Sequence, residues 1–121
     1  MSNLPQKEVI RTIIKALDSK LAEDIQLIGI KDLTIVADYF VIANGSSTTQ
    51  AKAIADEVEF KLKELGIEPV RVEGYQGATW IILDYADIVV HVFYKETRDY
   101  YKLERLWADG DQCDIDEYLK D

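Results

Sequence analysis

The sequence predicts a single α/β domain in which helices pack on a mixed five-stranded sheet. A chain of 121 residues with 48% hydrophobic residues is long enough to bury one core. Apolar residues recur at helical spacing in three segments, and short β-branched runs bounded by turn residues lie between them. The expected element order, α-β-β-α-β-β-β-α, is typical of a mixed sheet with helices packed on it.

Two amphipathic helices are expected in the first half of the chain. Pro5 suits the first turn of a helix, and apolar residues then recur every three or four positions as far as Leu21. Ser47 followed three residues later by Gln50 matches a capping box, which predicts the start of a second helix. Gly66 stands where a helix commonly ends, because glycine tolerates the left-handed backbone of that position.

Five short segments have the β-branched and aromatic composition of strands, and one more segment is expected to be helical. Asn44-Gly45-Ser46 predicts the end of the second strand, since these residues favour turns. The last helix should cover residues 95–107, in one or two pieces. We predict a domain of residues 1–108 and an acidic tail outside the sheet at 109–121. The strands are expected at residues 25–30, 39–43, 69–73, 79–83 and 88–93.

The net charge of the chain limits the kinds of partner that it can bind. Lys and Arg total 14 against 23 Asp and Glu, which gives a net charge of −9. Sequence-specific nucleic-acid binding requires a basic footprint, so we expect none. An acidic chain suits a basic protein partner, because opposite fields speed encounter, although the same charge also serves solubility.

The sequence also predicts a compartment. The single Cys113 excludes an intrachain disulfide and indicates a reducing compartment. The N-terminal stretch MSNLPQKEVIRTI has no apolar run of the kind found in signal peptides, and no segment is apolar enough for a membrane helix. We therefore expect a cytoplasmic protein without a membrane contact.

The stretch Thr79–Trp107 contains both tryptophans and the only histidine, so it is the candidate active site or recognition surface. If the loop of the predicted hairpin is Tyr85-Ala86, Asp84 faces Asp87 and Trp80 faces His91 on one side of the sheet. The other side is uniformly aliphatic and is expected to be core. The two aspartates are open to two interpretations, either turn residues or an acidic corner for basic side chains of a partner. The aliphatic residues in question are Ile81, Leu83, Ile88 and Val90.

The residues for catalysis are incomplete. His91 has no recognisable Ser or Cys nucleophile and no second histidine for a metal site. The turn at Asn44–Ser47 could hold a phosphate at the start of the next helix, but it lacks the lysine and the glycine spacing of phosphate-binding loops. A Gly-Ser turn between a strand and a helix also opens nucleotidyltransferase folds. Those enzymes also need an Asp-x-Asp pair on the next strand, and residues 69–73 contain none. We therefore expect no enzyme activity, no metal and no cofactor.

Several motifs follow one another along the chain in a recognisable order. They are ADYFVI at 37–42, GSS at 45–47, QAKAIA at 50–55, EG at 73–74, WIILDY at 80–85, VVHVF at 89–93 and YYKLERLW at 100–107. Together they resemble the ribosomal silencing factor family (RsfS), also called Iojap-related. The resemblance covers about residues 5 to 109, and the acidic tail is not part of it.

The resemblance implies a nucleotidyltransferase-like fold without catalysis and a homodimer in isolation. It also implies binding to the large ribosomal subunit, on protein number fourteen (uL type) at the intersubunit face. Such a factor sterically blocks joining of the small subunit and represses translation in starvation or stationary phase. Roles in large-subunit assembly are ascribed to relatives, and bacterial members are cytoplasmic.

The partner-binding site is predicted on the hairpin and the helix after it. Aromatic residues would supply buried contact area, and carboxylates would pair with basic side chains. Two alternatives stay open: a nucleotide-binding enzyme using Ser46 with carboxylates on the sheet, and a scaffold whose dimer recruits another partner. The predicted site residues are Trp80, Asp84, Tyr85, Asp87, His91, Tyr100, Tyr101 and Glu104.

Overall fold

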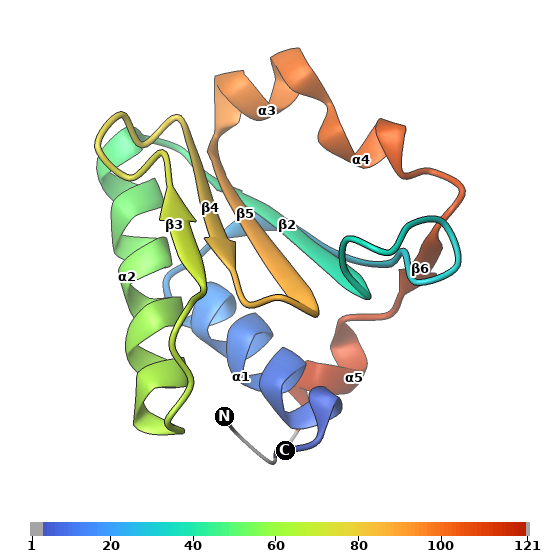
Figure 1. The fold of residues 1–121 in the computed structure, drawn as a ribbon. Helices are drawn as coiled ribbons and strands as arrows, with labels where there is room; N and C mark the ends of the chain where they lie inside the picture. The colour runs from blue at the N-terminus through green and yellow to red at the C-terminus, as the bar shows by residue number, and fades with distance from the viewer. Residues whose placement is uncertain (1–3, 121) are drawn as a thin grey trace.

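The computed structural model describes residues 4–120 and shows one mixed sheet with helices on both faces (Figure 1). Residues 1–3 of the stretch considered for a signal peptide, and residue 121 of the expected tail, lie outside the described part. The helices within it are α1 (Gln6–Ser19), α2 (Thr48–Glu64), α3 (Lys95–Tyr101), α4 (Leu103–Leu106) and α5 (Asp116–Leu119). The strands are β1 (Glu23–Gly29), β2 (Tyr39–Gly45), β3 (Arg71–Glu73), β4 (Trp80–Asp84), β5 (Ile88–Tyr94) and β6 (Asp111–Cys113).

The sheet has the order β3-β4-β5-β2-β1-β6, so β2 and β5 lie at its centre. These two strands pair in parallel, and the other neighbours pair antiparallel. The α/β class and the mixed sheet predicted from the sequence are confirmed. The central strands are apolar along almost their whole length because helices cover both of their faces.

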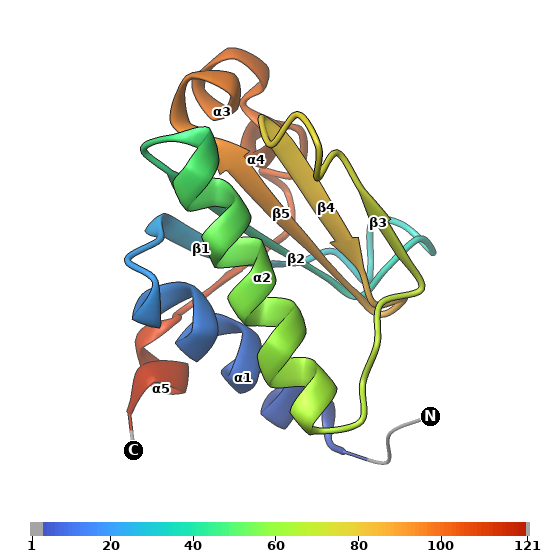
Figure 2. The same cartoon turned by 90° about the vertical axis from the view of Figure 1, so that its left-hand side faces the viewer.

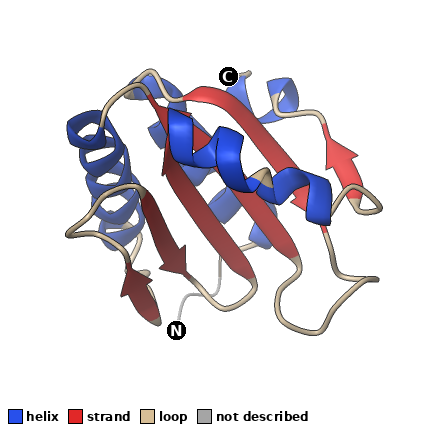
Figure 3. Ribbon diagram, turned by 90° about the horizontal axis from the view of Figure 1, so that it is seen from above, coloured by secondary structure: helices blue, strands red, loops and turns tan. Residues whose placement is uncertain are grey.

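Two apolar cores lie on opposite faces of the sheet. α1, α2 and α5 cover one face, and α3 with α4 crosses the other (Figures 1 and 2). The aliphatic side of the β4–β5 hairpin packs into the first core, as its alternation predicts. The second core is smaller and contains the aromatic residues of the hairpin, packed against Leu103 of α4 and the following Trp107. Figure 3 shows α3 and α4 lying across this face, with the β3 edge open beside them.

The sheet has six strands where five were predicted. The sixth, β6, lies in the segment expected to be a tail outside the sheet, and it pairs with β1 through Leu27 and Cys113. α5 packs against α1 and buries Tyr118. A three-residue edge strand with two exposed polar residues has no apolar alternation, so periodicity gave no signal for it.

The predicted pairing of the hairpin is wrong by two residues. Asp84 lies opposite Val89, and Trp80 lies opposite Phe93 instead of His91. Ala86 and Asp87 form the turn, with Ala86 at φ 71°. A shift of two positions keeps every side chain on its predicted face, so the assignment of residues to the two faces of the hairpin is still correct.

The predicted end of the second strand is also wrong, because β2 continues through Asn44 and Gly45. Asn44 is buried, and its side-chain amide donates to Oε1 of Glu23 at 2.9 Å. Tertiary contacts therefore override the turn preference of Asn and Gly at this point. The capping box after it is confirmed in its main bond, since the Gln50 amide donates to Oγ of Ser47 at 3.0 Å.

The two long helices end in the same hydrogen-bonded motif with different residues. In α2 the left-handed position is Gly66, at φ 80°, as the sequence predicts. In α1 it is Leu21, at φ 60°. The following amide, that of Ala22, donates to the carbonyl of Leu17 at 3.0 Å, which completes the Schellman arrangement.

Leu21→Gly is expected to raise the free energy of unfolding by about 1 kcal/mol, because glycine adopts this backbone without a Cβ clash. Leu21 is largely exposed, so little buried area is lost. Chemical denaturation measures the change. Gly66→Leu is the reciprocal variant and should destabilise; equal stability of all three chains would contradict the expectation.

Candidate functional site

An aromatic cluster forms the open part of the second sheet face. Trp80 comes from β4, Phe93 from β5 and Tyr101 from α3. The Trp80 ring centroid lies 4.8 Å from that of Phe93 and 5.0 Å from that of Tyr101. Tyr100 stands edge-to-face on Tyr101, with centroids 5.0 Å apart. Because a strand, its neighbour and the next helix each supply a ring, the cluster joins segments up to twenty-one residues apart.

The cluster is exposed on its helical side. Tyr100 is 80% exposed and Tyr101 is 53% exposed. Ile82 is half-buried on the same face, opposite Glu73 of the edge strand. Aromatic rings that are held by packing and open to solvent have the character of interface anchors.

His91 is buried next to this cluster and is hydrogen-bonded to Trp80. It is 5% exposed, and its Nδ1 accepts a hydrogen bond from Nε1 of Trp80 at 3.0 Å. An accepting Nδ1 places the proton of the neutral imidazole on Nε2, which has no hydrogen-bond partner within residues 4–120. Burial lowers the pKa of His91 to about 4, against a smaller opposing effect of the Asp84 charge. His91 is thus neutral at physiological pH and orients Trp80.

Acidification should destabilise the protein through His91. Its folded pKa lies below the unfolded value of 6.5, so the unfolded chain takes up the proton first. Stability present above pH 6.5 is therefore lost as the pH falls toward 4, by about 2 kcal/mol between pH 7 and pH 5. Denaturation of the wild type and His91→Phe at both pH values checks this. The pH-dependent loss should be smaller in the variant, and equal losses would contradict the assignment.

The acidic end of the hairpin is separate from the aromatic cluster. Oδ2 of Asp84 lies 3.2 Å from Nη2 of Arg71, and its Oδ1 accepts from the amide of Ala86 at 2.8 Å. Asp84 is therefore a turn residue with an ion-pair partner. Asp87 is exposed in the turn, and its backbone carbonyl accepts from the amide of Asp38 at 2.7 Å.

Tyr85 lies on the opposite face from Trp80. It packs against the first core, and burial raises the pKa of its hydroxyl. The hydroxyl oxygen has no hydrogen-bond partner within the described residues. The structure therefore brings Trp80, His91, Tyr100 and Tyr101 together, while Tyr85 and Asp87 belong to the far end of the hairpin.

Glu104 is held by a residue that sequence reasoning missed. Arg98 of α3 is 4% exposed, and its Nε donates to Oε2 of Glu104 at 3.1 Å. Its Nη1 donates to the carbonyl of Asp24 at 2.7 Å and to Oδ1 of Asn44 at 2.8 Å. Nη2 lies 3.4 Å from Oδ2 of Asp24. Arg98 thus ties α3 and α4 to β1 and β2. No local spacing marks it, because its hydrogen-bond partners lie up to 75 residues away.

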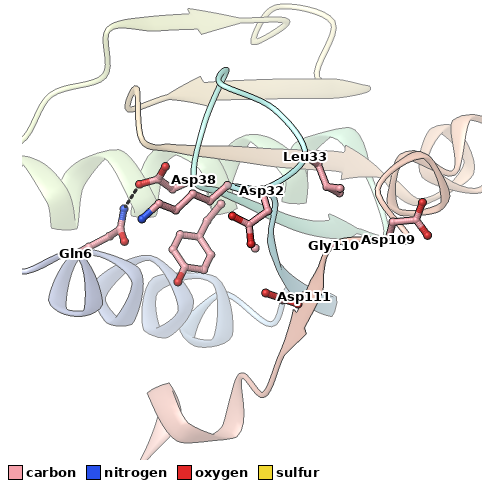
Figure 4. A pocket seen from close by; sticks show the side chains of 10 residues that line it. Gln6, Asp32, Leu33, Asp38, Asp109, Gly110 and Asp111 are labelled. Atoms are coloured by element: carbon pink, nitrogen blue, oxygen red, sulfur yellow. Dashed lines mark hydrogen bonds between the residues drawn. The ribbon is translucent and has the colours of Figure 1, made fainter.

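An acidic cavity lies elsewhere, between the 31–38 loop and the start of β6. It has a volume of about 230 Å³, and Figure 4 shows Gln6 donating to Asp38 at its rim. None of the predicted site residues lines it. Within residues 4–120 no group of three or more His, Cys, Asp or Glu side chains has the geometry to hold a metal ion. The lining carboxylates are Asp32, Asp38, Asp109 and Asp111.

Ser46 and Ser47 act on the helix that follows them. The Ser46 amide and hydroxyl both donate to Oε1 of Gln50, at 2.6 and 2.8 Å, and Ser47 caps α2. This turn therefore satisfies its own polar groups. No helix of the described part is long and apolar enough to cross a membrane.

The fold and this site define a single-domain α/β protein with an exposed aromatic surface on an acidic chain. The chain belongs to the ribosomal silencing factor family, because the family model "Ribosomal silencing factor during starvation" (RsfS) matches residues 3–121. That match confirms the resemblance and extends it through β6 and α5.

Individual relatives agree with this assignment. The chain is 42% identical over 111 residues to the ribosomal silencing factor of Bacillus subtilis, covering 92% of this chain and 94% of the relative. A crystal structure of a Chromobacterium violaceum protein superimposes with a TM-score of 0.84 at 36% identity, covering 87% of this chain and 88% of that one. A mouse relative is named "Mitochondrial assembly of ribosomal large subunit protein 1"; it is 32% identical over 102 residues, which are 82% of this chain and 45% of the relative.

Proposed function

We propose that this protein represses translation by binding the large ribosomal subunit on protein number fourteen, at the intersubunit face, and blocking joining of the small subunit. The exposed aromatic cluster around Trp80 carries the proposal. It is the part of the predicted site that is both assembled by the fold and open to a partner. Membership of the silencing factor family supports the ribosome as the target.

The mechanism requires no covalent chemistry. A protein bound over the intersubunit surface occupies volume that the small subunit needs, so the two subunits cannot meet. Trp80, Tyr100 and Tyr101 supply the contact, and His91 holds the Trp80 ring in place. Asp84 and Glu104 are each paired with an arginine of the same chain, so their contribution is to order the surface. Asp87, which is exposed in the turn, would act only at the rim of the interface, and Tyr85 packs against the core on the opposite face.

The net charge of −9 supports a basic protein as the direct contact. Opposite fields speed association with a basic ribosomal protein, and the same charge disfavours bare RNA. The protein would act in the cytoplasm, as a homodimer when it is away from the ribosome.

Tyr101→Ala should weaken binding to purified large subunits about tenfold or more, because it removes an interface ring and the contact with Trp80. Phe60→Ala is the matched control. Phe60 is 55% exposed on α2, on the other face of the sheet, against 53% for Tyr101. Co-sedimentation measures affinity, and a subunit-joining assay on a sucrose gradient measures the block.

Two outcomes would contradict the proposal. Failure of the wild type to co-sediment with large subunits would remove the ribosome as the target. Equal binding by Tyr101→Ala and Phe60→Ala would move the interface away from the aromatic cluster. Asp87→Lys changes the far end of the hairpin, and its affinity for large subunits shows separately whether the rim of the interface contributes.

A role in large-subunit assembly is the second candidate, and the name of the mouse relative favours it. Assembly predicts tighter binding to precursor subunits than to mature ones, whereas silencing predicts binding to mature subunits. Catalysis on nucleotides is disfavoured because Ser46 and Ser47 are used as caps. Calorimetry with ATP and Mg²⁺ tests it directly, since clear binding would revive an enzyme.

A further inference from the structure

The aromatic cluster continues into a shallow groove where β4 begins and β5 passes into α3. The groove has a volume of about 380 Å³. Tyr101 belongs to both features, because its ring centroid lies 5.0 Å from that of Trp80 and the residue also lines the groove. The lining residues are Thr79, Tyr94, Glu96, Thr97, Tyr100 and Tyr101.

The lining combines aromatic rings with one carboxylate. Tyr94, Tyr100 and Tyr101 contribute the rings, and Tyr100 and Tyr101 meet at an interplanar angle of 87°. Glu96 is exposed and makes no ion pair within residues 4–120.

The basic side chain of Arg98, two residues after Glu96 on the same helix, does not neutralise this groove. Arg98 is buried on the other side of α3 against Asp24 and Glu104. Its charge is balanced there. Glu96 therefore has no ion-pair partner among the described residues and lines the groove together with three tyrosines, on a chain whose net charge is −9.

We propose that this groove receives an arginine side chain of the basic protein that the aromatic cluster binds. A guanidinium is planar and weakly hydrated, so it stacks on tyrosine rings and pairs with a carboxylate at the same time. Phosphate does not suit the groove, because Glu96 would repel it. A purely apolar side chain would make no polar contact with Glu96, Thr79 or Thr97. The inference rests on the proposed function and names the side-chain class that gives it specificity.

The test measures the affinity of the full chain for purified large ribosomal subunits at low and at physiological ionic strength. Glu96→Gln should weaken binding about fivefold and reduce its salt dependence, because it removes one charge from a partly desolvated cation site. Glu68→Gln is the control, since Glu68 is an exposed carboxylate in the loop after α2. It carries the same change in net charge and should alter affinity less than about twofold.

The tyrosine is tested by a pair of variants. Tyr100→Phe retains a ring and Tyr100→Leu does not, so the first should bind about fivefold more tightly than the second. Equal affinity of these two variants, or equal effects of Glu96→Gln and Glu68→Gln, would overturn the arginine groove. Tighter binding by Glu96→Gln would do so as well, in favour of an apolar or phosphate occupant.

A defined probe separates this inference from the ribosome. Triarginine amide, trilysine amide and triglutamate are titrated while the ring resonances of Tyr94, Tyr100 and Tyr101 are followed by NMR. Only triarginine should shift all three strongly. No preference for triarginine would overturn the groove even if the subunits bind, and subunits that fail to bind while triarginine does would overturn only the ribosomal target.

Discussion

Arg98→Met is expected to lower the free energy of unfolding by about 2 to 4 kcal/mol, because it leaves the buried Oδ1 of Asn44 without its donor and breaks the ion pair with Glu104. The buried Oδ1 of Asn44 loses its donor, and the part-buried hydrogen bond to the carbonyl of Asp24 is lost as well. Asp24 sits at φ 48° beside the irregularity in β1 between Glu23 and Gln26, where strand pairing does not satisfy the backbone. Arg98 therefore stabilises a break in the sheet as well as the position of α3.

The consequence for function follows from what α3 carries. Tyr100 and Tyr101 lie at its end, and Glu104 of α4 pairs with the same arginine. Loss of Arg98 should therefore weaken binding to large subunits even at temperatures where the variant stays folded. Arg105→Met changes an exposed arginine of α4 and should cost less than about 0.5 kcal/mol.

Chemical denaturation compares the variants. Arg98→Lys keeps the charge but lacks the fork that reaches β1, β2 and α4 together, so it should recover only part of the loss. If Arg98→Met unfolds at the same denaturant concentration as Arg105→Met, the network does not stabilise the fold.

The sequence predicted features that depend on neighbouring residues, such as the two faces of the hairpin, and missed those that depend on distant residues, such as the contacts of Arg98. Apolar alternation depends on neighbours along the chain, so Ile81, Leu83, Ile88 and Val90 were assigned correctly to the core. The register of the same hairpin depends on its turn. Ala86 occupies the left-handed position instead of a glycine or asparagine, so no residue marked where the chain reverses.

The sequence pattern likewise predicted one part of the candidate site and missed the part that depends on long-range contacts. Trp80, His91 and Tyr101 meet because a strand, its neighbour and a helix converge, and the sequence could place the first two on one face. Asp84 and Asp87 are close in sequence but different in role, since one is bound by Arg71 and the other lies exposed in the turn. Long-range pairing, such as that of Arg98 with Asn44, leaves no pattern in the sequence.

Gly74→Ala is expected to cost roughly 3 kcal/mol or more, which places it among the strongly destabilising single changes. Gly74 has φ 77°, a conformation that side chains disfavour. A Cβ there would also lie 2.0 Å from the carbonyl oxygen of Trp80 and 3.1 Å from its carbonyl carbon. The contact is with backbone, so no side-chain rotation can relieve it. Either the turn after β3 or the start of β4 must move.

The matched control lies three residues along the same turn. A Cβ added at Gly77 would have no atom within 4 Å, and Gly77→Ala should change stability by less than about 0.5 kcal/mol. Because Gly74 meets the backbone of Trp80, its substitution should also displace the Trp80 ring from His91 and Tyr101. Denaturation curves, tryptophan fluorescence and large-subunit binding should therefore all change in Gly74→Ala, and all three should stay as in the wild type in Gly77→Ala. If Gly74→Ala lost stability with unchanged fluorescence and binding, the turn would support the fold but would not position the aromatic cluster.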